Sequence, residues 1–377
     1  MPIRFDRPPR ILVTRADRIG DLVLSTPVFP ALRRKYPAAK IACLTFLENR
    51  GLVLGHPDIE EVLLYDKKGS ERGWLGNLWF ASRLRRMKFD AVVHLHATNR
   101  MHLVGWLAGI PVRIGWRRKC AWALTHSLED LKREGRKHEA EYSFDLLEFL
   151  DVPCPEKVET SVPLNDREKQ SLEMLLRHHG INHSKPWIII HPGASCPSKV
   201  WPAEKFRALI GRLFEKYDAH VITVGARQDR RACEESLRGF ETVSSAGRRA
   251  GLSSESCLQT DLPASLHDND CHVTDLSGRV TLGMLAWLLK DSALLISNDS
   301  GPVHVATAVG TPVVSIFGRN QPGLSPARWR PLGQRSKVVW KDVGCRVCLA
   351  HRCRINFLCL DAISADEVFA AAKGFLR

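Results

Sequence analysis

The sequence predicts an α/β protein made of two doubly wound domains, and three observations carry this prediction. Its 377 residues exceed the roughly 100–200 residues of a typical single domain. Short apolar runs alternate with helix-like stretches along most of the chain, which is the pattern of parallel sheets covered by helices on both faces. The alternation breaks near residues 152–185, so we expect one domain on each side of this break.

The predicted strands are short aliphatic runs. Most are followed by a loop and then by a helical pattern, as expected for strands that are buried on both faces of a parallel sheet. The runs lie at residues 11–13, 41–46, 61–65, 91–95, 187–190, 220–224, 294–297 and 313–317.

Helix-breaking prolines and a helix cap set the predicted domain boundaries. The stretch 152–155 contains two prolines and ends a helix, and a further helix is predicted from about Asp166 to His179. Ser364 and Glu367 form a capping box at the start of a closing helix. The predicted parts are an N-terminal domain at 1–165, a linker at 166–185, a C-terminal domain at 186–360 with a Ser/Gly/Asp-rich surface insertion at 239–272, and the closing helix at 361–377.

The composition indicates a folded protein with negatively charged partners. Hydrophobic residues make up 44% of the chain and charged residues 25%, which excludes wholesale disorder. The formal charge of +14 favours nucleic acid, anionic lipid headgroups or phosphorylated small molecules as partners. No stretch approaches the roughly 20 apolar residues of a bilayer span, and residues 1–10 lack the apolar core of a signal peptide. We therefore expect a cytoplasmic protein that can touch a membrane surface.

Basic residues and tryptophans gather in the first half of the chain. Most charge runs are solvated faces, but several in one domain beside tryptophans favour an anionic acceptor or a membrane surface. None of the usual nucleic-acid-binding signatures is present. The basic clusters lie at 83–86, at Arg113 with 116–119, and at 132–138, and the tryptophans are Trp74, Trp79, Trp106, Trp116 and Trp122.

The first candidate loop, residues 14–21, follows the first predicted strand. The carboxyl end of a parallel strand is where open α/β sheets place their sites. Asp21 is the candidate general base, because a carboxylate after a glycine at a helix start can face a cleft. The structural alternative is that Asp17 or Asp21 caps the helix and pairs with Arg15 and Arg18.

The second candidate loop, residues 191–202, opens the second domain. Its small residues let backbone N–H groups approach an anion, Ser195 offers a hydroxyl, and Lys199 offers a point charge for a phosphate. The Gly-x4-Gly-Lys-Ser/Thr spacing of a P-loop is absent. The alternative is an ordinary strand-to-helix turn in which Trp201 and Pro202 start the helix.

The third candidate loop follows the predicted strand 294–297 and has Pro302 at a favoured first helical position. The free N–H groups and the positive end of the helix dipole predict a diphosphate site. Asp299 is unexpected beside an anion, so it either caps the helix or binds sugar hydroxyls. His304 can donate to a phosphate, the alternative being a packed helix residue. The loop 317–323 would line the same edge.

The 11 cysteines predict neither a disulfide scaffold nor a metal site. Most stand singly in apolar surroundings, as Cys43 does, where cysteine behaves as a small hydrophobe. Cys345, Cys348, Cys353 and Cys359 could close a zinc tetrahedron. The Cys-x5-Cys spacing of the second pair, with apolar residues inside, disfavours that interpretation, and we expect no metal.

Three motifs occur in a characteristic order: residues 15–27, residues 191–194 with 199–202, and residues 297–304. In this order they resemble the motifs of the ADP-heptose:lipopolysaccharide heptosyltransferases, glycosyltransferase family 9. The resemblance spans nearly the whole chain, and the spacing of the last cysteines also resembles many members. It implies a GT-B architecture, in which two Rossmann-like domains face each other across a central cleft.

The resemblance implies inverting transfer of heptose from ADP-L-glycero-D-manno-heptose to the inner core of lipopolysaccharide (Kdo-lipid A), with no metal or other cofactor. Asp21 is then the base that deprotonates an acceptor hydroxyl. The implied location is cytoplasmic and peripheral on the inner face of the inner membrane, without a nucleic-acid partner. The implied donor contacts are Ser195, Lys199, Asp299, Ser300, Gly301 and His304, with Ala194, Val280 and Asp229 as further candidates, and the candidate acceptor contacts are Arg18, Arg113, Arg117, Arg118 and Lys137.

Two departures from the family pattern keep alternatives open. Arg227 follows Gly225-Ala226 where some members carry a carboxylate for the donor's ribose, which makes Asp229 a substitute candidate. The segment 239–272 is also longer than the resemblance implies. The alternatives are the same fold with another nucleotide sugar or acceptor, and a non-catalytic anion-binding or nucleic-acid-binding protein on this fold.

Overall fold

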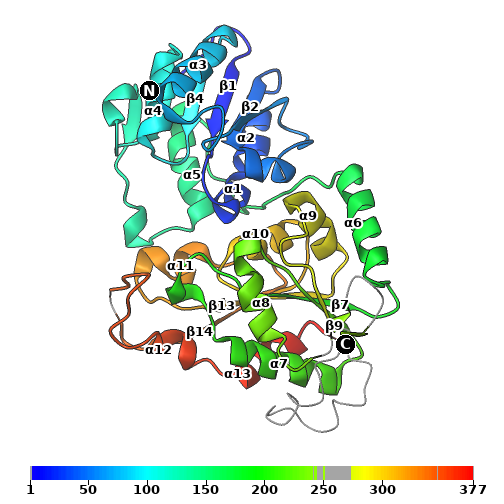
Figure 1. Ribbon diagram of the computed structural model, residues 1–377. Helices are drawn as coiled ribbons and strands as arrows, with labels where there is room; N and C mark the ends of the chain where they lie inside the picture. Colours follow the sequence, from blue (N-terminus) through cyan, green and yellow to red (C-terminus); the bar gives the residue numbers. More distant parts are fainter. Residues whose placement is uncertain (1, 241, 244–248, 251–272, 346, 377) are drawn as a thin grey trace. The chain divides into compact units, whose positions relative to one another are not determined.

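The computed structural model describes residues 2–240, 242–243, 249–250, 273–345 and 347–376. The chain divides into two compact units, Met1–Pro163 and Leu164–Arg377, which we call the first and second unit (Figure 1). Most of the predicted insertion at 239–272 lies outside the described residues. In the part of the chain that is described, no helix is long and apolar enough to span a bilayer.

The first unit is a parallel six-stranded sheet in the order β3-β2-β1-β4-β5-β6. The chain runs outward from β1 to β3 and then returns to place β4 on the other side of β1. This reversal is a topological switch point, the place at which open α/β sheets form their sites. The elements are β1 (Arg10–Thr14), α1 (Ile19–Ser25), α2 (Val28–Lys35), β2 (Lys40–Phe46), β3 (Glu61–Tyr65), α3 (Gly73–Arg86), β4 (Ala91–His94), α4 (Asn99–Leu107), β5 (Val112–Trp116), β6 (His126–Leu128) and α5 (Glu139–Leu147).

The second unit repeats this plan with the sheet order β10-β9-β11-β8-β7-β12-β13-β14, in which only the β9–β10 pair of the described strands is antiparallel. Its switch point lies between β7 and β12. The elements are α6 (Asp166–His178), β7 (Trp187–His191), α7 (Ala203–Lys216), β8 (His220–Thr223), α8 (Arg230–Ser236), β9 (Thr242–Val243), β10 (Arg249–Ala250), β11 (Val273–Asp275), α9 (Leu282–Lys290), β12 (Leu294–Asn298), α10 (Gly301–Ala308), β13 (Val313–Phe317), α11 (Pro326–Trp329), β14 (Ser336–Trp340), α12 (Leu358–Asp361) and α13 (Ala365–Lys373).

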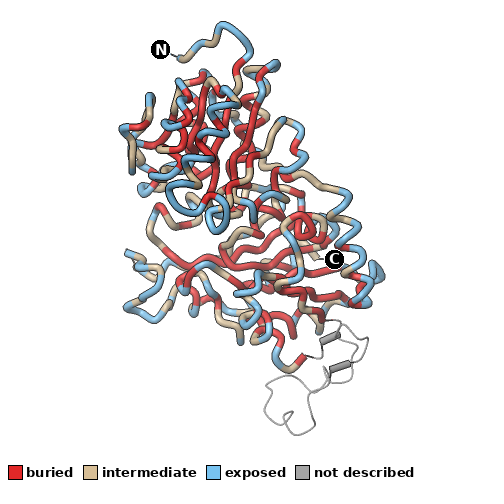
Figure 2. The backbone as a smooth tube through the Cα atoms, turned by 45° about the horizontal axis from the view of Figure 1, so that its top comes forward, coloured by how far each residue is buried: buried red, intermediate tan, exposed pale blue. Residues whose placement is uncertain are grey.

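The central strands of each unit form its core. All residues of β4, β7, β12 and β13 are buried, and Figure 2 shows the buried residues gathered in the strands of both units. Helices on both faces exclude water from these strands, which is why their sequences are continuous aliphatic runs rather than alternating ones. All the predicted strands are present, and β5, β6, β9, β10, β11 and β14 add to them within the described residues.

Local sequence signals explain several helix ends. Pro27 stands at the N-cap of α2 and separates it from α1, since its ring cannot continue the preceding helix. The predicted capping box of α13 is confirmed: the Ser364 hydroxyl accepts a hydrogen bond from the Glu367 N–H at 3.2 Å, and the Glu367 carboxylate accepts one from the Ser364 N–H at 2.8 Å. The helix predicted from about Asp166 is α6, which packs on α9 of the second unit.

Candidate active site

The switch point of the first unit is organised around Arg15, a buried residue directly after β1. Its Nη2 lies 2.5 Å from Oδ1 of Asp21 and 3.1 Å from Oε1 of Glu139, and its Nε lies 3.4 Å from Oδ2 of Asp17. The Nη1 group also donates to the carbonyl oxygen of Leu95, after β4, at 3.2 Å. One guanidinium therefore ties the loops after both strands to the start of α5.

Lys132 and His96 extend this cluster. Lys132 Nζ lies 3.0 Å from the same Glu139 oxygen and 4.7 Å from the centroid of the Trp116 ring, and His96 Nδ1 lies 3.1 Å from Oδ2 of Asp17. Two cations thus face three carboxylates. Because charges buried together are costly unless paired, the cluster fixes the positions of its members.

Burial and neighbouring charges shift the pKa values of several members of this cluster. Burial opposes the Arg15 charge, but its three carboxylate neighbours outweigh burial and raise its pKa above the ordinary value. Burial raises the pKa of Asp17 above its ordinary value, although Arg15 opposes this shift. Burial, with the nearby Arg15 charge, lowers the pKa of His96 to about 4. His96 is therefore neutral at pH 7, and Arg15 is a permanent cation.

Asp21 lies in the first turn of α1 with 16% of its side chain exposed. The helix begins after Arg18, which makes no side-chain cap, so Asp21 is not the capping residue that the structural alternative considered. The Arg15 pairing considered in that alternative is present. A partly exposed carboxylate whose Oδ1 is held by a buried arginine is fixed in position and still reachable from solvent, which suits a general base.

The switch point of the second unit joins the loops after β7 and β12. Asn298 Nδ2 donates to the Pro192 carbonyl at 2.6 Å, and Asn298 Oδ1 accepts from the Trp201 N–H at 3.1 Å. His191 Nδ1 lies 3.1 Å from the hydroxyls of both Ser297 and Ser300, which are 3.0 Å apart. These contacts bring the second and third candidate loops together.

Lys199 and Asp299 form an ion pair, with Nζ 2.6 Å from Oδ2 and both side chains largely buried. The N-cap of α10 is Ser300, so Asp299 does not cap that helix, contrary to one of the two expectations for it. Pro302 lies in the first turn of α10, as predicted, and Gly301 begins the helix. His304 is buried in α10, and Ser195 is exposed.

Asp229, a weaker candidate from the sequence, lies against the second loop. A Cβ at Gly193 would meet its Cγ at 2.5 Å, and one at Gly225 would meet its Cβ at 2.8 Å, so only glycine leaves room for this carboxylate. Its Oδ2 accepts from the Ala226 N–H at 2.8 Å. His191 Nε2 is 3.9 Å from the same oxygen, and burial lowers the pKa of His191 to about 4. Val280, another candidate, is half-buried just before α9.

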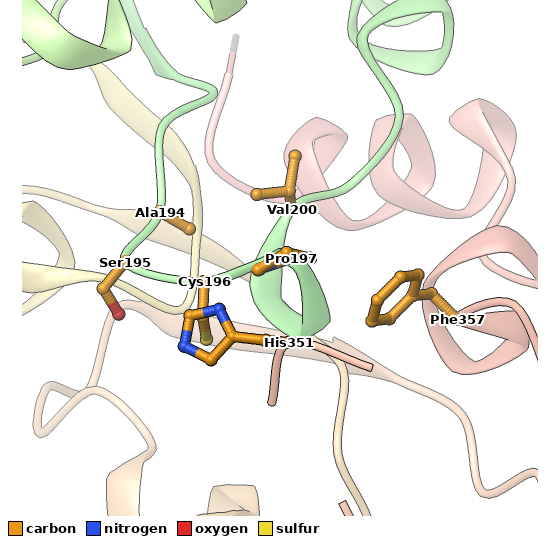
Figure 3. Close-up of a pocket in the computed structure, with 7 residues that line it drawn as sticks. All are labelled: Ala194, Ser195, Cys196, Pro197, Val200, His351 and Phe357. Atoms are coloured by element: carbon orange, nitrogen blue, oxygen red, sulfur yellow. The ribbon is translucent and has the colours of Figure 1, made fainter. Parts of the chain in front are cut away.

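A pocket of about 510 Å³ opens beside the second loop (Figure 3). Ala194, Ser195 and Val200 line it from the loop, and His351 and Phe357 line it from the cysteine-bearing segment near the C-terminus. The two segments are joined by the Ser198 N–H, which donates to the Ala350 carbonyl at 3.1 Å. The cysteine-bearing segment thus forms one wall of the pocket.

Arg319, directly after β13, supports this loop and was not a candidate in the sequence. Its Nε donates to the Ser198 hydroxyl at 2.8 Å, and its Nη2 lies 2.5 Å from the Cys196 sulfur. Its φ of 65° is in the left-handed region, which is unfavourable for a residue with a side chain. The contacts of the Arg319 side chain with the loop therefore hold this unfavourable backbone conformation in place.

Four candidate acceptor residues, Arg113, Arg117, Arg118 and Lys137, make their contacts outside these clusters, whereas Arg18 lies in the first loop beside Asp17. The Arg113 guanidinium donates to the carbonyls of Ile110 and Ala123, and Arg118 and Lys137 form ion pairs with Asp130 and Asp145. Arg18 and Arg117 are exposed. In the described ranges, no three His, Cys, Asp or Glu side chains are grouped to hold a metal ion.

Comparisons with known proteins match both the sequence and the fold of this chain. The model of glycosyltransferase family 9 (heptosyltransferase) matches residues 78–249 and 254–358. A lipopolysaccharide heptosyltransferase 3 of Escherichia coli is 26% identical over 95% of this chain and 96% of its own length. A family 9 glycosyltransferase of Veillonella parvula superposes with a TM-score of 0.77, 22% identity and coverage of 100% and 99% of the two chains. The ADP-heptose lps heptosyltransferase II of E. coli superposes with a TM-score of 0.73, 22% identity and coverage of 97% and 98%. The predicted fold class, GT-B with Rossmann-like domains, is confirmed.

Proposed function

Because this chain belongs to glycosyltransferase family 9, the heptosyltransferase family, we propose that it transfers heptose from ADP-L-glycero-D-manno-heptose to the inner core of lipopolysaccharide. The observation that carries the proposal is that the two switch points hold different kinds of residues. The first holds a fixed carboxylate, Asp21, and the second holds a loop of small residues with Lys199 beside the start of α10. We assign acceptor binding to the first unit and donor binding to the second.

Asp21 is the proposed base. Its Oδ1 is occupied by Arg15, so its other oxygen takes the proton of the acceptor hydroxyl. The acceptor oxygen then forms a bond to the anomeric carbon of heptose while the bond from that carbon to the diphosphate oxygen breaks. The configuration at the anomeric carbon inverts, because attack and departure occur on opposite faces, and ADP leaves with the bond's electron pair.

The leaving ADP carries the charge that the second unit must stabilise. We propose that Lys199, Ser195 and the N-terminus of α10 at Ser300 and Gly301 supply this stabilisation, as oriented N–H groups and a cation do for an anion. His304 is proposed to contact a phosphate and Asp299 the heptose hydroxyls. On this scheme Lys199 exchanges part of its pairing with Asp299 for the diphosphate.

The donor and acceptor are proposed from two supports. The names of the relatives specify ADP-heptose and lipopolysaccharide for those proteins. The charge of +14 suits a phosphorylated acceptor. Since the proposed scheme uses side chains and helix N–H groups for charge stabilisation, it needs no metal or other cofactor. We further propose a cytoplasmic, peripheral location at the inner face of the inner membrane, where such an acceptor is made.

Transfer from ADP-heptose to heptose-deficient lipopolysaccharide, with EDTA present, tests the proposal. The expected result is a product one heptose heavier, formed at the same rate with and without EDTA. Donor binding without product would indicate another acceptor. Product formed only with a different nucleotide sugar would favour the alternative that Arg227 raises. The absence of both binding and product with every sugar nucleotide would refute the proposal.

A further inference from the structure

The helix α3 carries four large apolar side chains on its exposed face. Trp74, Leu75, Leu78 and Trp79 are 71%, 65%, 41% and 55% exposed. Their spacing of i, i+1, i+4 and i+5 places them along one side of the first two turns. We call these four residues the α3 apolar face.

The α3 apolar face is not needed to hold the helix on its sheet. The opposite side of α3 carries Phe80, Ala81 and Leu84, which are buried in the core of the first unit. Asn77, from the first half of the helix, accepts a hydrogen bond from the Tyr65 hydroxyl at 2.6 Å. Since the core is completed by these residues, four exposed apolar side chains including two tryptophans indicate an interaction surface.

Positive charge surrounds the α3 apolar face. The last turns of the same helix expose Arg83, Arg85 and Arg86, and Lys67, Lys68 and Arg72 precede it. The acidic residues of this segment are turned inward or used locally. Glu71 is buried, with Oε2 accepting from the Asp66 N–H, and Asp66 Oδ1 accepts from the N–H groups of Lys68 and Gly69.

We propose that the α3 apolar face and these basic residues form a docking surface for a bilayer containing anionic phospholipids. Tryptophan and leucine enter the headgroup region, where tryptophan is favoured, while arginine and lysine contact lipid phosphates. A second copy of this chain fits less well, because self-association through this surface would bring two arginine-rich rims together.

The topology relates this docking surface to the loop with Asp21, and this step rests on the proposed function. The α3 helix follows the carboxyl end of β3, and the loop that carries Asp21 follows the carboxyl end of β1 in the same parallel sheet. The first turns of α3 therefore follow the same side of the sheet, where the strands end, as the loop with Asp21 does. Docking through them brings that edge towards an acceptor that is anchored in lipid.

Co-sedimentation with phosphatidylcholine vesicles, with and without phosphatidylglycerol, tests the proposal. We expect the full chain to bind only the anionic vesicles, and to release as salt is raised. The double variant Trp74→Ser/Trp79→Ser should bind at least about tenfold more weakly, and Arg83→Gln/Arg85→Gln/Arg86→Gln about 100-fold more weakly. Trp122→Ser is the matched control, because Trp122 is a similarly exposed tryptophan on the same unit and should leave binding unchanged.

Three results would overturn the inference: binding of both α3 variants equal to that of the parent, equal loss in Trp122→Ser, or a dimer that these variants dissociate without any vesicle binding by the parent. A cooperative thermal unfolding transition like that of the parent checks the folding of each variant. The assay is independent of catalysis, so a chain that binds vesicles through α3 but transfers no heptose would contradict the proposed function alone.

Discussion

Glu139 is the residue on which the first candidate loop depends most. It is buried between Arg15 and Lys132 and pairs with both. Replacing it with Gln leaves two buried cations short of a partner, which costs about 3 kcal/mol in the free energy of unfolding. Urea unfolding of Glu139→Gln measures this. Glu134→Gln is the control, because Glu134 forms an exposed pair with Arg136 and should lose no more than about 1 kcal/mol. Equal losses in the two variants would contradict the assignment.

Lys199 gives a second prediction at this scale. If its ammonium group contacts the diphosphate, Lys199→Gln should raise the Kd for ADP about tenfold or more, as expected for a lost charge-assisted hydrogen bond. Lys199→Arg keeps the charge and the pairing with Asp299, so it should retain most of the affinity. Lys205→Gln removes another paired lysine of the second unit and should bind ADP normally. Calorimetry with ADP measures all four proteins, and unchanged affinity in Lys199→Gln would argue against the donor assignment.

The sequence predicted the individual loops of the site better than their partners. Asp21, Lys199 and Asp299 stand in short motifs that can be read along the chain. Glu139 is 124 residues from the arginine it contacts, and only the packing of α5 against α1 brings the two together. The loop 317–323 was expected at the same edge, but nothing in its sequence singled out Arg319 as the residue that contacts the second loop. The capping alternatives for Asp21 and Asp299 were wrong, because the N-caps of α1 and α10 are Arg18 and Ser300.

At the scale of elements, the fully buried strands were predictable, and of the described edge strands only β3 was. The central strands are aliphatic runs because both faces are covered. In contrast, β5 contains Arg113 and Gly115, and β6 and β14 are edge strands with polar residues and incomplete burial. The sequence therefore indicated that Arg113 of β5 belongs to a charged patch. In the structure its guanidinium donates to backbone carbonyl groups.

The contact between β4 and α4 predicts a pH dependence of stability. His94 at the end of β4 is buried, 2.9 Å from the Thr14 hydroxyl, and its ring centroid is 5.1 Å from that of His102 on α4. Burial, with smaller effects of His102 and Arg113, lowers the pKa of His94 well below 6.5. The unfolded chain therefore binds a proton that the folded one does not. Stability is full above pH 6.5 and falls below it, by up to about 1.4 kcal/mol per pH unit.

Thermal or urea unfolding at pH 7.5 and 5.5 measures this effect. The loss of stability on acidification should be about 1 kcal/mol smaller in His94→Gln than in the parent. His126→Gln, on the edge strand β6 of the same sheet, should show the parent's full loss. The same loss in all three proteins would mean that His94 is not responsible.

At the scale of the whole molecule, the fold class followed from the alternation of strands and helices and from the break between the two halves. The order of three motifs then led to the family, which the family match and the superpositions support. Periodicity could not reveal which edge of each sheet gathers polar residues. The strand order did so, because each switch point collects side chains that are far apart in the chain.

The central claim is that this chain is a glycosyltransferase whose base is Asp21. Its most direct test is the rate of heptose transfer by Asp21→Asn at saturating donor in EDTA, beside Asp17→Asn, which alters the neighbouring carboxylate. We predict that kcat falls by about 10²–10⁴-fold in Asp21→Asn, by less than about tenfold in Asp17→Asn, and that ADP binding is unchanged in both. Parental kcat in Asp21→Asn, or an equal loss in Asp17→Asn, would contradict the account.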